Sequence, residues 1–191
     1  DGVFLSYGNY NSGNTILDDH SVELISAYIE QGGDVYLEGG DALGYDQNDD
    51  EVFLALFGLE SASDGGTNPI DSLFGEDDAL ADGMYFSGNT QSSNSWIDQY
   101  LPLDDAEVAF TESNYGDVAV QYDAGDERQS FCFSYAISKL SDGDSTATKD
   151  DLMNQILVFF GIVSSIDEIE KDPFSCMVYP NPTSSQTTIS Y

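Results

Sequence analysis

The stretch DVYLEGGDALG, residues 34–44, ends an apolar run in an acid, two glycines and a second acid. In an open α/β sheet, ligands collect outside the carboxyl ends of the strands, where glycines let the backbone turn tightly and approach a bound group. Glu38 and Asp41 stand at such a turn and could form a carboxylate pair for general acid and base catalysis. Two acids on a glycine turn can also point apart, so a shaped loop without chemistry is the alternative.

A second group of oxygen-bearing side chains follows in YDQNDDE, residues 45–51. Alternating acidic and amide side chains resemble the first half of a calcium-binding loop, although the glycine and the distal glutamate of a full EF-hand are missing. A solvated acidic loop that caps the following helix is the alternative interpretation. Calcium is the single cofactor that the sequence suggests, with Asp46, Asn48, Asp50 and Glu51 as its candidate ligands.

Histidine and cysteine are too scarce to build a familiar catalytic or metal site. His20 is the only histidine, and its position at a predicted helix start favours a solvated side chain. Cys132 and Cys176 could form a disulfide in an oxidising compartment, or remain as two buried or unpaired thiols. Because Cys132 lies between two phenylalanines in an alternating strand pattern, we expect it to be packed in the core and unreactive.

The chain is extremely acidic: 36 Asp and Glu oppose 4 Lys and Arg among 191 residues, for a formal net charge of -32. Such a surface repels phosphate backbones and anionic lipids, which argues against nucleic acid as a partner. With 40% hydrophobic residues the chain can still bury one sizeable core. Its longest apolar run, residues 156–163, is too short for a transmembrane segment, and we expect no signal peptide at Asp1.

Hydrophobic periodicity predicts a βαβ unit at the start of the chain. Residues 2–8 are typical of a buried strand, and Val22, Ile25 and Ile29 mark an amphipathic helix with Asp19 as its N-cap. A second strand, DVYL, follows, so a parallel pairing with a right-handed crossover is expected. Further along we expect a helix near residues 50–58, a surface excursion over 61–83, strands at 83–88 and 106–112, a helical turn at 94–101, a hairpin over 116–135 and a helix over 149–160.

Three segments of this pattern resemble the class I glutamine amidotransferase-like domains, a flavodoxin-like α/β family. They are DGVFLSYGN (1–9), DVYLEGGDAL (34–43) and SFCFSYA (130–136), and the resemblance spans residues 1–161. It implies a three-layer sandwich with a mostly parallel sheet and a β-hairpin. The family's opening strand and helix are missing, so we expect the chain to begin partway into the domain.

The resemblance does not extend to the family's catalytic residues. That chemistry needs a thiolate at the strand-to-helix elbow, a histidine that activates it and a carboxylate that orients the histidine. Here the elbow offers Leu37, Glu38 and Gly39, and the late strand has residues 133–136, FSYA, where Phe-His-Pro-Glu would be expected. The sequence therefore predicts a non-catalytic structural or binding domain, with a surface carbohydrate or a protein as its ligand.

The end of the chain carries a second resemblance. VYPNPTSSQTTISY, residues 178–191, resembles the start of the C-terminal sorting domain that Bacteroidetes proteins carry for the type IX secretion system. This implies the secretion machinery as a partner and an extracellular or outer-membrane surface location; a proline-stiffened β-edge linker is the alternative. The implied sorting signal is Tyr179, Pro180, Asn181 and Pro182, and the implied organisation is an α/β domain over 1–163, a linker over 164–173 and a short β segment over 174–191 that begins the sorting domain.

Two further hypotheses concern modification and context. Ser72 and Ser145 each follow an aspartate in a predicted loop, as in the O-glycosylation sites of Bacteroidetes proteins. The alternative to a non-catalytic module is the C-terminal portion of a secreted hydrolase of the peptidase type, whose catalytic residues lie upstream of residue 1.

Overall fold

A computed structural model describes residues 2–8, 15–88, 95–125, 128–142 and 147–162. Several sequence predictions lie outside these residues and stay predictions: they concern Ser145, Cys176, the sorting signal at 179–182 and the two C-terminal units, 164–173 and 174–191.

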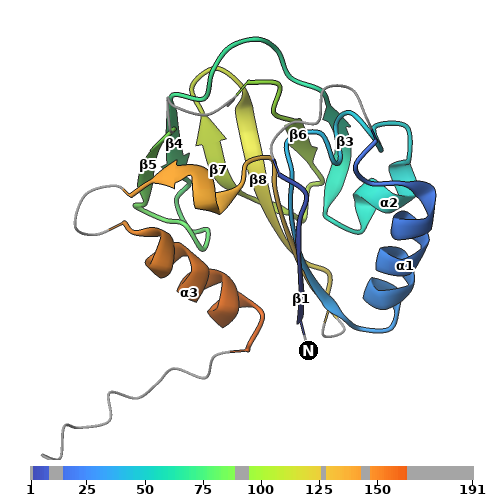
Figure 1. Ribbon diagram of the computed structural model, residues 1–191. Helices are drawn as coiled ribbons and strands as arrows, with labels where there is room; N and C mark the ends of the chain where they lie inside the picture. The colour runs from blue at the N-terminus through green and yellow to red at the C-terminus, as the bar shows by residue number, and fades with distance from the viewer. Residues whose placement is uncertain (1, 9–14, 89–94, 126–127, 143–146, 163–191) are drawn as a thin grey trace, which may run out of the picture.

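An eight-stranded sheet with the order β1-β2-β9-β8-β7-β4-β5-β10 dominates the structure, and β3 pairs with β6 in a separate two-stranded sheet (Figure 1). The strands are β1 (Gly2–Ser6), β2 (Asp34–Glu38), β3 (Leu59–Ser63), β4 (Ser72–Gly75), β5 (Tyr85–Gly88), β6 (Gln99–Pro102), β7 (Glu107–Glu112), β8 (Gly116–Asp123), β9 (Gln129–Phe133) and β10 (Leu140–Ser141). The helices are α1 (Asp19–Glu30), α2 (Glu51–Ala55), the 3-10 helix η1 (Ile137–Lys139) and α3 (Lys149–Phe159).

The prediction of a mostly parallel sheet is wrong. Among the described strands, β1, β2 and β9 run parallel to one another, and the other pairings in the large sheet are antiparallel. The physical reason is the length of the connections: short turns join β7 to β8 and β8 to β9, and strands joined in this way must be antiparallel. The fold is therefore a mixed α/β structure in which a parallel edge continues into an antiparallel sheet.

The N-terminal βαβ unit is confirmed, with two corrections. The first strand is not a buried one, because β1 lies at the edge of the sheet and none of its five residues is buried. The second correction concerns the helix start. The N-cap is Asp18, not Asp19, because the Asp18 carboxylate accepts a hydrogen bond from the Ser21 backbone N–H at 2.9 Å. Val22, Ile25 and Ile29 are buried on one face of α1, as their spacing predicts.

Helices cover both faces of the parallel strands. Val35 and Leu37 of β2 belong to a core cluster with α1 and α2, while Tyr36, between them, packs in a second cluster with Leu152 and Ile156 of α3. Figure 1 shows α1 and α2 on one side of β1 and α3 on the other. Because successive strand residues point to opposite faces, this arrangement explains why all of β2 is buried.

The middle of the chain differs most from the sequence prediction. Residues 61–83 are not a surface excursion, because they contain most of β3 and all of β4, with Ile70 and Leu73 buried. Residues 99–102 form β6 and not a helical turn. The strands β5 and β7, the β8–β9 hairpin and α3 are confirmed. No helix within the described ranges has the length and apolar character that a membrane span requires.

Candidate functional site

Glu38 ends β2 at the carboxyl end of the parallel strands, where the sequence places a site. Its side chain is 7% exposed. One carboxylate oxygen accepts a hydrogen bond from the Ser6 hydroxyl at 2.5 Å, and the other accepts from the Tyr36 hydroxyl at 2.6 Å and from the Ile137 backbone N–H at 2.8 Å. Glu38 therefore joins β1, β2 and η1 through one buried, hydrogen-bonded charge.

Tyr36 is suited to be a permanent hydrogen-bond donor to Glu38. Burial raises the pKa of Tyr36 well above its usual value, and the adjacent Glu38 charge and their shared hydrogen bond raise it further. The phenol thus keeps its proton and continues to donate to Glu38. Asp41 is also buried in this turn, at 2% exposure, and a catalytic pairing of its carboxylate with that of Glu38 stays a prediction.

The glycines after Glu38 serve close backbone contacts. The Gly39 N–H donates to the Phe133 carbonyl and the Gly40 N–H to the Gly8 carbonyl, each at 2.9 Å. A Cβ on Gly39 would lie 3.0 Å from the Cβ of Tyr7, so a larger residue would crowd the turn. The EGGD turn is consequently fixed against β9 and against the loop that follows β1.

A cavity of about 530 Å³ opens beside the Glu38 carboxylate. Its lining is mostly apolar, with the ring of Phe4 stacked on Tyr36 at a centroid distance of 5.3 Å. Besides Glu38, polar groups come from Ser6, Ser138, Lys149 and Asp150. The cavity has the concave, largely apolar character of a binding site, but its one buried carboxylate already has its hydrogen-bond partners.

Sequence reasoning missed Asp98, an acid that is fully buried. One of its oxygens accepts a hydrogen bond from the Leu43 N–H at 2.9 Å, and the other has no partner among the described residues. Burial raises the pKa of Asp98 well above its usual value, and the nearby charges of Asp41 and Asp64 add to the effect. No local pattern distinguishes Asp98 from the many other acids of this chain, so the sequence carried no signal for it.

The four candidate calcium ligands are divided between structural roles and the surface. The Asp46 carboxylate accepts hydrogen bonds from the backbone N–H groups of Ile16 and Leu17 at 2.7 and 2.9 Å. Asp50 is the N-cap of α2, and Asn48 and Glu51 are exposed. Within the described ranges, no three His, Cys, Asp or Glu side chains form a group that could hold a metal ion. The calcium site stays a prediction.

Salt and calcium titrations separate a general charge effect from a specific site. We expect NaCl to raise the melting temperature, because it screens the self-repulsion of a chain with net charge -32. A stabilisation of about 1 kcal/mol corresponds to about 2–4 °C for a chain of this size. If calcium binds as predicted, the Asn48→Ala and Glu51→Ala variants will lose the additional response to CaCl₂ and keep the response to NaCl. A melting temperature unchanged by both salts contradicts the electrostatic argument.

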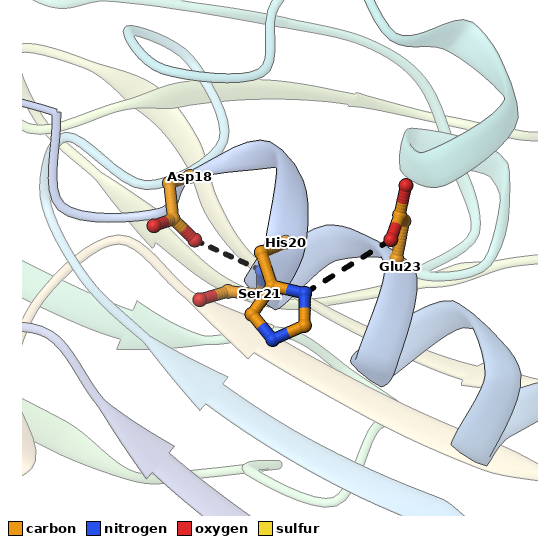
Figure 2. A network of polar contacts seen from close by, with 4 residues as sticks. All are labelled: Asp18, His20, Ser21 and Glu23. Carbon is orange, nitrogen blue, oxygen red and sulfur yellow. Dashed lines mark hydrogen bonds and ion pairs between the residues drawn. The ribbon is translucent and has the colours of Figure 1, made fainter.

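His20 lies on the surface at the start of α1, as expected from its position in the sequence. Its side chain is 76% exposed, and its Nδ1 lies 4.0 Å from the Glu23 carboxylate on the same helix. Figure 2 shows this contact beside the N-cap hydrogen bond from the Ser21 backbone N–H to the Asp18 carboxylate. Within the part of the chain that the structure describes, the imidazole therefore pairs with a neighbour in sequence on the surface of α1.

Cys132 is packed in the core, in agreement with the sequence prediction. It is fully buried in β9, and its Sγ donates a weak hydrogen bond to the Val120 carbonyl at 3.8 Å. Burial raises the pKa of the Cys132 thiol far above its usual value, so thiolate is scarce at neutral pH. We expect iodoacetamide to leave Cys132 unmodified in the native protein and to modify it in urea, as peptide mapping will show; rapid native modification contradicts the burial.

Ser72 is not in a loop, as the sequence suggested, but opens β4. Its hydroxyl lies 3.1 Å from the Tyr85 hydroxyl of β5, and the residue is only partly exposed. Glycosylation of Ser72 remains a prediction, although this contact would have to give way to a glycan.

Comparison with known proteins finds likeness in structure but not in sequence. No protein-family model matches the chain, and no curated protein is significantly similar. A cytoplasmic protein from Salmonella typhimurium aligns with a TM-score of 0.52 at 16% identity, over 83% of this chain and 71% of that chain. A Thermoplasma acidophilum protein, provisionally named as part of a GMP synthase, gives 0.53 at 13% identity, over 84% of this chain and 73% of the other. A glutamine amidotransferase from Thermotoga maritima gives 0.43 at 10% identity, over 83% and 62%.

At these identities the likeness concerns the fold alone. The chain therefore shares an α/β fold with the Salmonella typhimurium and Thermoplasma acidophilum proteins. The roles of individual residues have to be argued from this chain's own side chains.

Proposed function

We propose that this chain contains a non-catalytic, amidotransferase-like domain that acts as a structural or binding module. The observation that carries the proposal is that the Glu38 carboxylate is already held by hydrogen bonds within the protein. At the strand end where the resembled family has its nucleophile, this chain has a carboxylate hydrogen-bonded to Ser6, Tyr36 and Ile137. The helices on both sides of the parallel strands support a flavodoxin-like layering around this turn.

The remaining chemistry of the site supports the same conclusion. Acyl transfer needs an attacking atom and a base within hydrogen-bonding distance of it. Cys132 is buried and holds its proton, and among the described residues His20 pairs with Glu23 on the surface of α1. The cavity beside Glu38 offers its shape, a largely apolar surface and the charged side chains of Lys149 and Asp150.

Glutaminase and peptidase assays on the purified chain test the proposal. We expect ammonia release and peptide cleavage at neutral pH to equal those of a heat-denatured sample. A Glu38→Gln variant is the matched control, because it removes the buried carboxylate that lines the cavity and keeps the size of the side chain. Turnover by the parent chain that falls with Glu38→Gln overturns the proposal.

We further propose that the protein is exported as type IX secretion cargo to the cell surface or the medium. The resemblance of residues 178–191 to a sorting domain supports this, with the secretion machinery as the partner. Replacement of Tyr179, Pro180, Asn181 and Pro182 by alanine in a secreting Bacteroidetes host is expected to retain the protein inside the cell. Export unchanged by the four substitutions contradicts the proposal.

A further inference from the structure

Within the described ranges, the strand β1 forms an uncovered edge of the large sheet. Among the described strands it pairs with β2 alone, so the backbone N–H and C=O groups on its other side have no strand partner. Phe4, at its centre, is 41% exposed, whereas every residue of the neighbouring β2 is buried. Proteins usually cover such an edge, because it can pair with any extended segment.

Apolar hollows flank this edge on both faces of the sheet. On the α1 side, Val3 and Leu5 line a cavity of about 310 Å³. On the α3 side, Phe4 and Met153 line the larger cavity beside Glu38. A strand laid along β1 would send alternate side chains into the two hollows, so it needs apolar side chains on both of its faces.

We propose that residues 174–178 of this same chain, FSCMV, add to β1 as a further strand. Phe174, Cys176 and Val178 would fill one hollow, and Ser175 and Met177 would face the other. The segment is as long as β1, and residues 174–191 contain no charged side chain although the chain has a net charge of -32. Docking therefore adds no repulsion between acids. The sorting-signal residues 179–182 lie directly after the docked strand, and their prolines cannot continue its hydrogen bonding.

The path of the chain brings this segment to the right place. The side chain of Ile162, the last described residue, lies against the first residue of β1: a Cβ built on Gly2 would be 2.7 Å from the Ile162 Cδ1. The 11 residues from 163 to 173 can span about 36 Å, about twice the length of a five-residue strand. The segment can therefore reach either end of β1.

A tethered segment is favoured over a second copy of the protein. Two copies that pair through β1 would bring together two chains of net charge -32. A segment joined by a short linker acts at an effective concentration of about 1 mM and loses no translational freedom when it docks.

Disulfide trapping with the natural Cys176 tests the docking in the full chain. Single cysteines are introduced at Val3, Phe4 or Leu5, the protein is mildly oxidised, and crosslinks are mapped by mass spectrometry. Because alternate strand residues face opposite sides, Cys176 should join either Phe4→Cys or the pair Val3→Cys and Leu5→Cys, but not both. Tyr85→Cys on β5 is the matched control, since Tyr85 is 42% exposed and Phe4 41%.

We expect the crosslink yield on the favoured face of β1 to exceed that at Tyr85→Cys by about tenfold. Equal yields at β1 and β5, no crosslink at any β1 position, or crosslinks only between two chains overturn the proposal; the last outcome identifies a second copy as the occupant. These results are independent of the ammonia assay, so docking and the absence of catalysis can fail separately.

Hydrogen exchange gives a second readout without a new thiol. Met177→Pro removes a backbone N–H from the docked strand, and we expect the β1 amides to exchange about tenfold faster as a result. Met177→Leu keeps the strand and should leave the exchange unchanged. Equal exchange in both variants overturns the docking.

Discussion

Replacing Glu38 with alanine is expected to lower the free energy of unfolding by about 3 kcal/mol. The loss arises because the buried Tyr36 hydroxyl and the buried Ile137 N–H both lose their acceptor. A buried donor without a partner costs about 1–3 kcal/mol, whereas Ser6 is exposed and can bond to water. Glu38→Gln keeps one carbonyl acceptor and is expected to cost about 1–2 kcal/mol. Urea unfolding with unchanged m-values measures both losses.

Net charge alone predicts the opposite sign. Removing one negative charge from a chain of net charge -32 relieves repulsion, so a purely electrostatic view expects Glu38→Gln to stabilise the fold. Glu23→Gln on α1 is the matched control, because Glu23 is 81% exposed and should change stability by less than about 0.5 kcal/mol. If Glu38→Ala unfolds at the same urea concentration as Glu23→Gln, Glu38 does not hold β1, β2 and η1 together.

The sequence predicts those parts of the fold that depend on local chemistry. The spacing of Val22, Ile25 and Ile29 and the glycines after them were sufficient for α1 and for the parallel pairing of β1 with β2. The alternating runs and the turn between them were sufficient for the β8–β9 hairpin. In each case the residues that decide the structure lie within one helix or one hairpin.

The antiparallel half of the sheet depends on contacts that are remote in sequence. The strands β4 and β5 have four residues each, too few to show a period, and Leu73 of β4 pairs with Glu112 of β7. The helical turn expected at residues 94–101 failed for the same reason, because β6 forms through its pairing with β3. Tertiary pairing overrode weak local preference in both places.

The candidate site also combines features that the local sequence predicts with features that depend on contacts remote in sequence. Residue type and the glycine turn were enough to single out Glu38, but its role follows from a serine 32 residues before it and a backbone N–H 99 residues after it. Asp98 is the converse case, since only the tertiary structure places this acid in the core.

Asp98 is expected to make the stability of the protein fall as pH rises. Burial raises its pKa in the folded state above the ordinary value of an aspartate in the unfolded chain. Between these two pKa values the folded state binds more protons than the unfolded state, so the free energy of unfolding decreases with pH. One proton corresponds to about 1.4 kcal/mol per pH unit within this window. The stabilisation is complete below the ordinary aspartate pKa and is lost progressively up to the raised pKa.

An Asp98→Asn variant removes this dependence. The asparagine carbonyl can still accept the Leu43 N–H, and the amide cannot ionise. We expect the free energy of unfolding of the variant to rise relative to that of the parent protein by up to about 1.4 kcal/mol for each pH unit above the ordinary aspartate range. Asp19→Asn, at an exposed position on α1, is the control for removal of one charge and should run parallel to the parent curve.

Repulsion among the other acids also weakens the fold as pH rises. The effect of Asp98 is therefore measured by how much the slope of the free energy of unfolding against pH differs between Asp98→Asn and the parent protein. Urea unfolding at pH 4, 5, 6 and 7 provides the slopes. Parallel curves for Asp98→Asn and the parent would show that the Asp98 carboxyl reaches solvent. In that case the turn at Leu43 is held by an ordinary surface carboxylate and not by a neutral acid in the core.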